Sequence, residues 1–473
     1  MLFNSFAFFG FLAVVYAVYR LLGTRAQNVW LLLASYVFYG CWDWRFLGLI
    51  WLSTGVDYAF ARAIGRSTDE RRRLWLLQAG LVFNLGILGV FKYANFFVGS
   101  WVDLMGLFGI RVSWTSLHII LPVGISFYMF QALGYLIDVY RKRIEPIDDP
   151  VEHGLFIAFF PQLVSGPIER ATHMLPQLRN ARVLSLEVSV RASYLILLGL
   201  FKKAVADGLA PSVDAVFAQA QPASGSQVLL AVYVFCLQIY ADFSGYTDIA
   251  RGVAKLFGID LVENFMTPYF SASPAEYWTR WHISLSTWVR DYVYTPMAIY
   301  FMRKSERRIE EFKPHVYSMV LMGLWHGAAW TYVVWGLYHG LLLVLWAGVR
   351  WPKRLRPWRK RVPRAAWMVV FFQLTGLGML IFRADTLQQL GTFVHALFFQ
   401  FGTLPPTFMT PPMAALLGAP ILVLLDIVAY LKISDRFYET WPRPARACLY
   451  AVISLLLAMG SANEPAKFIY FQF

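Results

Sequence analysis

The stretch Val316–Val349, VYSMVLMGLWHGAAWTYVVWGLYHGLLLVLWAGV, is predominantly apolar and carries two histidines, His326 and His339. A straight helix of this length, about 34 residues, would run about 51 Å, whereas a bilayer's hydrocarbon core is about 30 Å thick. Lys and Arg flank the stretch on both sides, and such clusters mark the cytoplasmic face of a membrane protein. The flanking residues are Arg303, Lys304, Arg307, Arg308 and Lys313 before it, and Arg350, Lys353, Arg354, Arg356, Arg359, Lys360, Arg361 and Arg364 after it. The segment is therefore predicted to cross the membrane and return as a hairpin.

The hairpin would bring both histidines to the middle of the membrane. With its tip near Thr331, His326 would lie about 18 Å and His339 about 15 Å from the inner edge, at about 1.5 Å of rise per residue. An ionisable side chain at this depth is costly and indicates function, and desolvation keeps imidazole neutral, as a base. The alternative is a histidine that only hydrogen-bonds a neighbouring helix. Aromatic neighbours predict an apolar tunnel that protects an ester or thioester from water; they are Trp325, Trp330, Trp335 and Tyr338.

Composition and charge predict an all-α, polytopic membrane protein along the whole chain. Of 473 residues, 58% are hydrophobic and only 15% charged. The net charge of +14 is explained by basic residues in short loops, so nucleic-acid binding is not expected. About twelve spans are predicted, with re-entrant and interfacial helices around a central tunnel, in a single domain of residues 1–473. Basic loops follow the first, third and fifth predicted spans and are therefore expected in the cytoplasm. This alternation places both termini outside and residues 244–314 in the cytoplasm. The predicted spans are 5–22, 28–43, 46–63, 74–97, 117–138, 191–210, 226–243, two arms of 315–349, 366–383, 413–431 and 446–463.

Several features do not fit a simple span. Gly154–Pro167 is short and broken by proline, which predicts either a re-entrant hairpin buried in protein or an interfacial helix. Lys202 and Lys203 interrupt an apolar run, and we expect them to extend to the membrane interface. Asp242–Asp248 is expected to end one helix and start another, with a turn at its glycine and helix capping by its polar residues. The three cysteines, Cys41, Cys236 and Cys448, have no metal-ligand spacing and are expected to be buried.

A second group of candidate functional residues lies in the segment Tyr277–Tyr292, which the predicted topology places in the cytoplasm. On one continuous helix its large apolar residues form a stripe suited to lipid headgroups: Trp278, Trp281, Leu285, Trp288 and Tyr292. Arg280 and Arg290, with His282, are suited to a polyanionic cofactor, since guanidinium groups pair with phosphate. Pure headgroup anchoring is the alternative explanation of the same pattern.

Motifs along almost the whole chain resemble the membrane-bound O-acyltransferases, in particular the bacterial branch that includes alginate O-acetyltransferase. The matching residues are Pro161-Gln162, Ser165-Gly166-Pro167, Asp242–Tyr246, Arg280–Trp288, Arg290-Asp291-Tyr292, Gly323–Gly327, Phe382–Asp385 and Phe468–Phe473. The resemblance implies an enzyme that draws acetyl groups from cytoplasmic acetyl-CoA and passes them across the bacterial inner membrane to an exported polysaccharide. It also implies a periplasmic acetyltransferase partner and polysaccharide export machinery.

The resemblance assigns roles to individual residues. The family's essential histidine matches His326, and a second histidine of this branch matches His282. We therefore expect His326 to act as general base, or to carry a covalent acyl group, with His339 orienting it. The acetyl-CoA site is expected at Arg280, Arg290, Trp281 and Trp288, with no metal or prosthetic group. The alternatives are acylation of peptidoglycan or teichoic acid, a proton-coupled transporter, and a scaffold subunit of an export complex.

Overall fold

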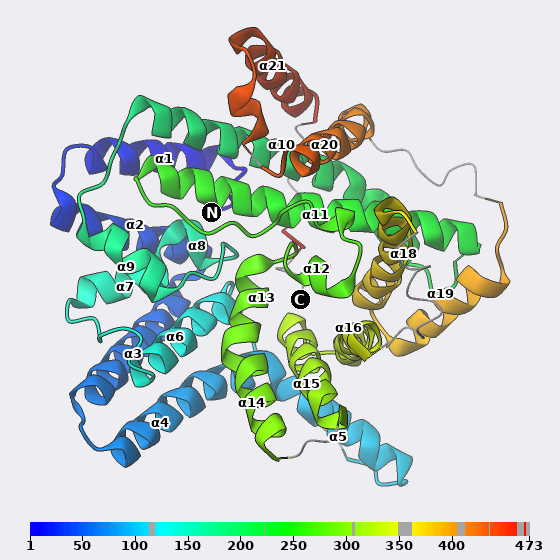
Figure 1. Cartoon of the computed structure of the whole chain (residues 1–473), viewed down its shortest axis with the longest axis horizontal. Helices are drawn as coiled ribbons and strands as arrows, with labels where there is room; N and C mark the ends of the chain where they lie inside the picture. The colour runs from blue at the N-terminus through cyan, green and yellow to red at the C-terminus, as the bar shows by residue number, and fades with distance from the viewer. Residues whose placement is uncertain are drawn as a thin grey trace. The chain divides into compact units, whose positions relative to one another are not determined.

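The fold of the described residues is entirely helical, with no strand among them, which confirms the all-α prediction. The computed structural model (Figure 1) describes residues 1–112, 119–222, 224–304, 308–348, 362–403, 412–434, 436–460 and 468–469. The basic flank 350–361 and the motif residues 470–473 lie outside this range. The chain divides into two compact units, residues 1–196 with 249–262, and residues 197–248 with 263–473. A single domain over the whole chain stays a prediction.

The helices of the first unit come mostly from the N-terminal part of the chain. They are α1 (Phe6–Tyr19), α2 (Thr24–Asp43), α3 (Leu47–Arg66), α4 (Glu70–Leu88), α5 (Ala94–Leu107), α6 (Ile125–Tyr140), α7 (Pro150–Ala158), α8 (Phe160–Leu163) and α9 (Ala171–Arg179). Two long helices, α10 (Leu186–Phe217) and α11 (Gly225–Leu256), contribute to both units.

The second unit contains the segments with the candidate histidines. Its further helices are α12 (Pro274–Trp278), α13 (Ile283–Val289), α14 (Thr295–Lys304), α15 (Arg308–His326), α16 (Trp330–Gly348), α18 (Arg364–Arg383), α19 (Leu387–Phe399), α20 (Met413–Lys432) and α21 (Arg443–Gly460).

Six segments in the described residues are long and apolar enough to cross a membrane. They are Glu70–Leu107, Gly225–Leu256, Trp330–Ala347, Arg364–Arg383, Met413–Lys432 and Arg443–Gly460. The chain is therefore a multi-pass membrane protein, since a bilayer requires about 20 apolar residues per helix. The further spans that would bring the number to about twelve remain predictions.

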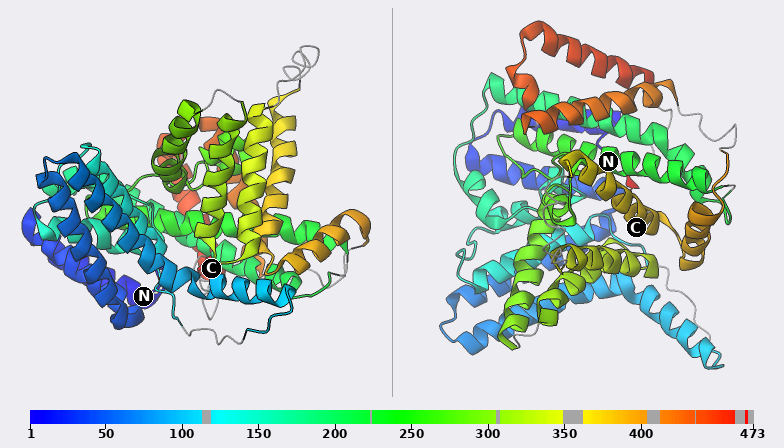
Figure 2. Two further views of the ribbon diagram at one scale, coloured as in Figure 1. Left: turned by 90° about the horizontal axis from the view of Figure 1, so that it is seen from below. Right: turned by 45° about the vertical axis from the view of Figure 1, so that its right-hand side comes forward.

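The predicted histidine hairpin is present as α15 and α16, which lie side by side (Figure 2). They are antiparallel and closely packed, because glycines let the backbones approach. A Cβ at Gly323 would lie 2.1 Å from the Tyr332 carbonyl oxygen, and one at Gly336 would lie 2.3 Å from that of Met319. The connection is residues 327–329. The turn thus comes slightly before Thr331, the predicted tip.

Cysteine labelling tests the orientation of this hairpin. Lys304→Cys and Ala365→Cys place thiols at exposed positions before α15 and near the start of α18. In a background lacking the three native cysteines, both should resist an impermeant thiol reagent outside intact cells and react once the membrane is opened. Both flanks are basic, so both are expected in the cytoplasm. Labelling of only one of them from outside would contradict the hairpin topology.

The proline-broken segment forms two short helices, α7 and α8, and residues 153–169 are all buried. Asp149 caps α7 through its side chain, and Pro150 occupies the first turn, where its missing N–H is not needed. A helix lying on the surface would expose one face. The continuous burial therefore favours the re-entrant alternative over the interfacial helix.

Lys202 and Lys203 do not extend to an interface, so that prediction is wrong. Both are buried, with 8% and 6% exposed. Lys202 Nζ lies 2.7 Å from Asp248, and Lys203 Nζ lies 2.6 Å from Asp207 and 2.8 Å from Asp242. Ion pairing inside the protein removes the energetic reason to reach water.

The predicted turn in Asp242–Asp248 is also wrong, because the segment lies inside the continuous helix α11. Its glycine serves close packing instead. A Cβ at Gly245 would lie 2.8 Å from the Gly199 carbonyl oxygen, so α10 and α11 touch through backbone here. Asp242 Oδ2 accepts a hydrogen bond from the Ile469 N–H at 2.7 Å rather than capping a helix.

Of the cysteines, Cys236 is buried as expected, but Cys41 and Cys448 are exposed.

Candidate functional site

His326 is the last residue of α15, where the closely packed hairpin turns. Its side chain is buried and surrounded by aromatic rings. The imidazole centroid lies 4.8 Å from Trp325, 5.0 Å from Trp335 and 5.3 Å from Phe382, all in edge-to-face geometry. These contacts hold a basic ring in an apolar environment, where electrostatic interactions with a reacting group are strong.

His339 lies in α16 and reaches His326 through one shared side chain, Trp335. The Trp335 ring centre is 4.7 Å from that of His339 and 5.0 Å from that of His326. On its other side, His339 contacts Trp278 at 5.2 Å and stacks on Tyr277 at 6.3 Å with an interplanar angle of 9°. The two histidines therefore share one environment, with an indole linking them.

His282 occupies a strained backbone position immediately before α13, with a φ of 43° that non-glycine residues rarely adopt. Its Nδ1 lies 3.2 Å from the side-chain oxygen of Asn264, which also accepts hydrogen bonds from the Ser284 N–H and hydroxyl. An amide oxygen only accepts, so Nδ1 carries the proton and Nε2 is the basic nitrogen of the neutral ring. Burial lowers the pKa of His282 to about 3, and the ring stays neutral at physiological pH.

Trp325 links His282 to the other two histidines. Its ring centre lies 5.9 Å from that of His282 and 4.8 Å from that of His326. The five side chains alternate in the order His282, Trp325, His326, Trp335, His339, and we call them the imidazole–indole row. The row is built from the start of α13, the end of α15 and the middle of α16.

The expected continuous helix over Tyr277–Tyr292 is wrong, and so is its exposed stripe. The chain forms α12, breaks over residues 279–282, continues as α13 and then forms a wider π-helical turn at Arg290–Tyr294. Trp281, Leu285, Trp288 and Tyr292 are buried by protein rather than facing outward. Burial excludes headgroup anchoring by these four side chains.

The segment α12 is held by a serine and a glutamate at its N-terminus. Ser273 accepts a hydrogen bond from the Glu276 N–H at 3.2 Å, and Glu276 Oε2 accepts one from the Ala272 N–H at 3.0 Å. This reciprocal capping fixes the short helix that presents Tyr277 and Trp278 to His339. Trp281 joins the same group, because it stacks on Tyr277 at 5.6 Å and 13°.

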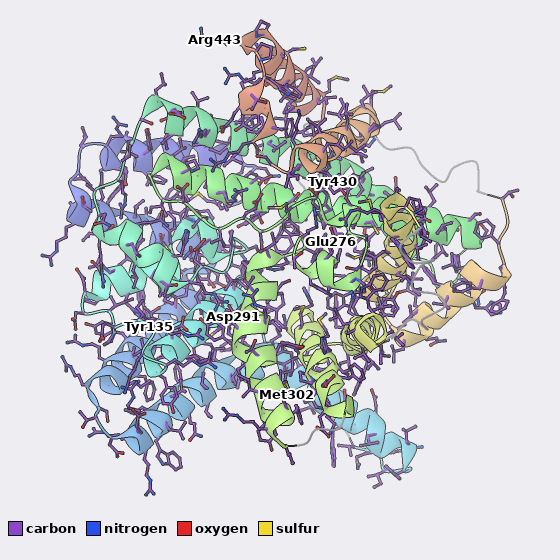
Figure 3. All side chains as sticks on the ribbon, viewed as in Figure 1. Tyr135, Glu276, Asp291, Met302, Tyr430 and Arg443 are labelled. Carbon is purple, nitrogen blue, oxygen red and sulfur yellow. The ribbon has the colours of Figure 1, made fainter. Side chains whose placement is uncertain are left out.

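Arg280 belongs to a charged cluster that also contains Glu276, Arg364 and Tyr430. Figure 3 labels Glu276 on α12 and Tyr430 on α20. The Arg280 guanidinium pairs with Glu276 at 3.1 Å and lies over the Tyr430 ring at 5.6 Å. Arg364 also bonds Glu276, and its Nε donates to the Tyr430 hydroxyl at 3.1 Å. Two guanidinium groups share one carboxylate, which leaves positive charge to attract an anion.

Arg290 and Trp288 are less closely associated with the row. The Arg290 side chain is 62% exposed and pairs with the adjacent Asp291 at 2.8 Å, a residue that Figure 3 labels beyond α13. The Trp288 ring contacts Tyr292 at 5.0 Å.

Of the expected tunnel residues, Trp325 and Trp335 border His326, and Tyr338 contacts His339 at 5.4 Å. Trp330 is 52% exposed and does not fit a tunnel wall.

Sequence reasoning missed Asn264 and Tyr277 and gave Trp278 a different role. Asn264 precedes His282 by 18 residues in an irregular segment, so no helical spacing could have paired them. Tyr277 and Trp278 lie about 60 residues from His339 along the chain, beyond any local pattern. Among the described residues, no three His, Cys, Asp or Glu side chains come together as a metal site.

The chain is similar to known membrane acyltransferases over most of its length. The model of the membrane-bound O-acyltransferase family matches residues 149–383. A probable alginate O-acetylase of Azotobacter vinelandii is 38% identical over 85% of this chain and 79% of its own length. The one from Pseudomonas putida is 34% identical over the full length of both chains. A peptidoglycan O-acetyltransferase of Helicobacter pylori is 30% identical over 100% of this chain and 98% of its own. This chain belongs to the membrane-bound O-acyltransferase family and is an O-acyltransferase.

Proposed function

We propose that this enzyme acetylates an exported, alginate-like or cellulose-like polysaccharide with acetyl groups from cytoplasmic acetyl-CoA. The observation that carries the proposal is the burial of His326 at the end of α15, among aromatic rings that exclude water. Support for the acetyl group and the polysaccharide comes from the likeness to probable alginate O-acetylases, which is full-length for the one from Pseudomonas putida. The enzyme acts in the bacterial inner membrane, with a periplasmic acetyltransferase and the export machinery as partners.

In the proposed reaction, His326 takes the proton of an acceptor hydroxyl as that oxygen attacks the thioester carbon. The carbonyl π electrons move to oxygen and form a tetrahedral oxyanion. Collapse of this intermediate reforms the carbonyl, breaks the carbon–sulfur bond and releases CoA thiolate, which receives the proton from His326. The products are an acetyl ester and CoA. A covalent acyl-histidine is the alternative pathway, with the imidazole nitrogen as first nucleophile.

The other two histidines support His326 in this proposal. His282 is held neutral by burial and oriented by Asn264, so it contributes no competing positive charge. His339 acts as a positioning residue through Trp335. The acetyl-CoA phosphates are proposed to bind near Arg280, with Trp281 beside it, and the exposed Arg290 and Trp288 contribute to the approach.

Reversing the charge of Arg280 or Arg290 tests the proposed acetyl-CoA site. Arg280→Glu should weaken acetyl-CoA binding about 10- to 100-fold at low salt, because a charge-assisted hydrogen bond is worth about 1.5–3 kcal/mol. Arg290→Glu should give a smaller loss, since its side chain is largely exposed. Both losses should shrink as salt screens the phosphates. Isothermal titration of the purified protein measures the affinity.

Arg45→Glu is the matched control, because Arg45 is an exposed arginine paired with nearby Asp43. It should leave affinity unchanged. Equal affinity of the Arg280→Glu protein and the wild type at low salt would contradict a phosphate site there and return Arg280 to a structural role with Glu276.

A second candidate function is acetylation of peptidoglycan, and the likeness to the Helicobacter pylori peptidoglycan O-acetyltransferase over the whole chain favours it as the runner-up. Mass spectrometry of exported polysaccharide and of peptidoglycan, from cells with and without the gene, separates the two. Loss of O-acetyl groups from the polysaccharide alone is the expected result.

A further inference from the structure

Three rings beside His326 form a closed triangle of contacts, which we call the indole triangle: Trp278, Trp335 and His339. Their centres are 5.9 Å apart for Trp278 and Trp335, 5.2 Å for Trp278 and His339, and 4.7 Å for Trp335 and His339. The Trp335 corner also touches His326 at 5.0 Å. The triangle is thus adjacent to the proposed general base.

Each ring of the triangle carries a buried nitrogen that lacks a hydrogen-bond partner among the described residues. These nitrogens are Nε1 of Trp278, Nε1 of Trp335 and Nδ1 of His339. Buried polar atoms in proteins are nearly always paired, and one without a protein partner requires an explanation, such as a catalytic role or a bound ion or water. Three such atoms on mutually contacting rings indicate that a polar group of a substrate belongs here.

The chemistry of the indole ring identifies the substrate atom. An indole N–H donates a hydrogen bond and accepts none, so its missing partner is an acceptor. In acyl transfer the acceptor that gains charge is the carbonyl oxygen, and buried donors aimed at that oxygen stabilise the transition state strongly.

We propose that Trp278 and Trp335 donate hydrogen bonds to the acyl carbonyl oxygen of the thioester and to the oxyanion formed from it, with His339 as the residue that positions Trp335. This inference rests on the proposed function. It adds the oxyanion-binding groups, which the proton transfer at His326 leaves unassigned. As the intermediate collapses, the electron pair returns from oxygen to the carbon–oxygen bond and the indoles release a neutral carbonyl. No further reactant is needed.

Removal of each indole N–H tests the proposal. Trp335→Phe and Trp278→Phe keep an aromatic ring but lose the donor. Each should lower kcat for CoA release from acetyl-CoA at least about 10²-fold, the usual effect of losing one oxyanion-hole donor. The assay uses purified full-length protein with its periplasmic partner and the polysaccharide fraction of the producing cells. The dissociation constant of acetyl-CoA should change less than about threefold, since an oxyanion donor acts mainly in the transition state.

Trp346→Phe is the control, because Trp346 lies in α16, the helix of Trp335, and its ring contacts Trp367 at 5.6 Å. It should retain kcat within about twofold. If a phenylalanine variant folds poorly, benzothienylalanine at position 335 keeps the indole shape and replaces the N–H with sulfur, so it must show the same loss of kcat. Unchanged kcat in the benzothienylalanine protein, or a loss confined to acetyl-CoA affinity, would overturn the proposal.

The same experiment separates this inference from the proposed function. If the His326→Gln protein is inactive but the tryptophan variants have normal kcat, the oxyanion-binding role of the indoles is refuted, and the general-base role of His326 is retained. If the wild type releases no CoA from acetyl-CoA, the proposal that acetyl-CoA is the acetyl donor fails. The O-acetyl content of exported polymer in cells carrying each variant then decides the role of the triangle, and wild-type content in both tryptophan variants would overturn it.

Discussion

His326→Ala is expected to lower the rate of polymer acetylation by about 10²- to 10⁴-fold, the usual contribution of a general base. Protein yield and membrane insertion should stay near normal, because the helices of the hairpin are held by glycine-mediated packing rather than by the imidazole. The O-acetyl content of exported polysaccharide, measured by mass spectrometry against protein level, gives the result.

His315→Ala is the matched control for this variant. His315 lies on the same helix, but its ring contacts Tyr294 and lies outside the imidazole–indole row. It should retain near wild-type acetylation. A His326→Ala protein with normal product levels would refute general-base and covalent roles alike and would favour a scaffold function.

Lys203→Met is expected to destabilise the protein by about 3–5 kcal/mol, the usual cost of removing one partner of a buried ion pair. The change leaves two carboxylates, those of Asp207 and Asp242, without the ammonium group that lies within 2.8 Å of each. Thermal unfolding in detergent should show a much lower midpoint than that of the wild type.

Two comparisons distinguish a charge effect from lost packing. Adding Asp207→Asn to Lys203→Met should restore part of the stability, because one uncompensated charge is removed. Lys142→Met breaks an exposed pair with Glu70 and should cost no more than about 1 kcal/mol. A Lys203→Met protein as stable as the Lys142→Met protein would contradict the buried-pair account.

The hairpin could be predicted because the length of the apolar segment and the charge of its flanks together allow one topology. An apolar run too long for a single crossing, with basic residues at both ends, must turn back. The glycines at 323 and 336 could not be interpreted in the same way, since their role depends on which residue of the other arm they face. Sequence therefore predicted the two arms but not how closely they pack.

The lysines show where a local argument fails. Side-chain length and an apolar neighbourhood favour extension to the interface. The acidic partners of Lys203 lie on two elements, Asp207 one turn later in α10 and Asp242 in α11. The pairing with Asp242 arises only when those helices come together at Gly245.

The aromatic stripe over Tyr277–Tyr292 failed for a related reason. Its spacing suits one amphipathic helix, but His282 adopts a positive φ that ends any helix at that point. The bonds to Asn264 compensate for this strain. As a result Trp278 contacts His339 and Trp281 stacks on Tyr277, instead of both facing lipid. The indole triangle therefore has no signature in the sequence.

Transfer across a sealed membrane tests the central claim most directly. Vesicles would contain purified wild-type protein, with acetyl-labelled acetyl-CoA inside and the polysaccharide with its periplasmic partner outside. We expect label in ester linkage on the polysaccharide with the wild type and background levels with His326→Ala. Equal labelling by both proteins would contradict the account.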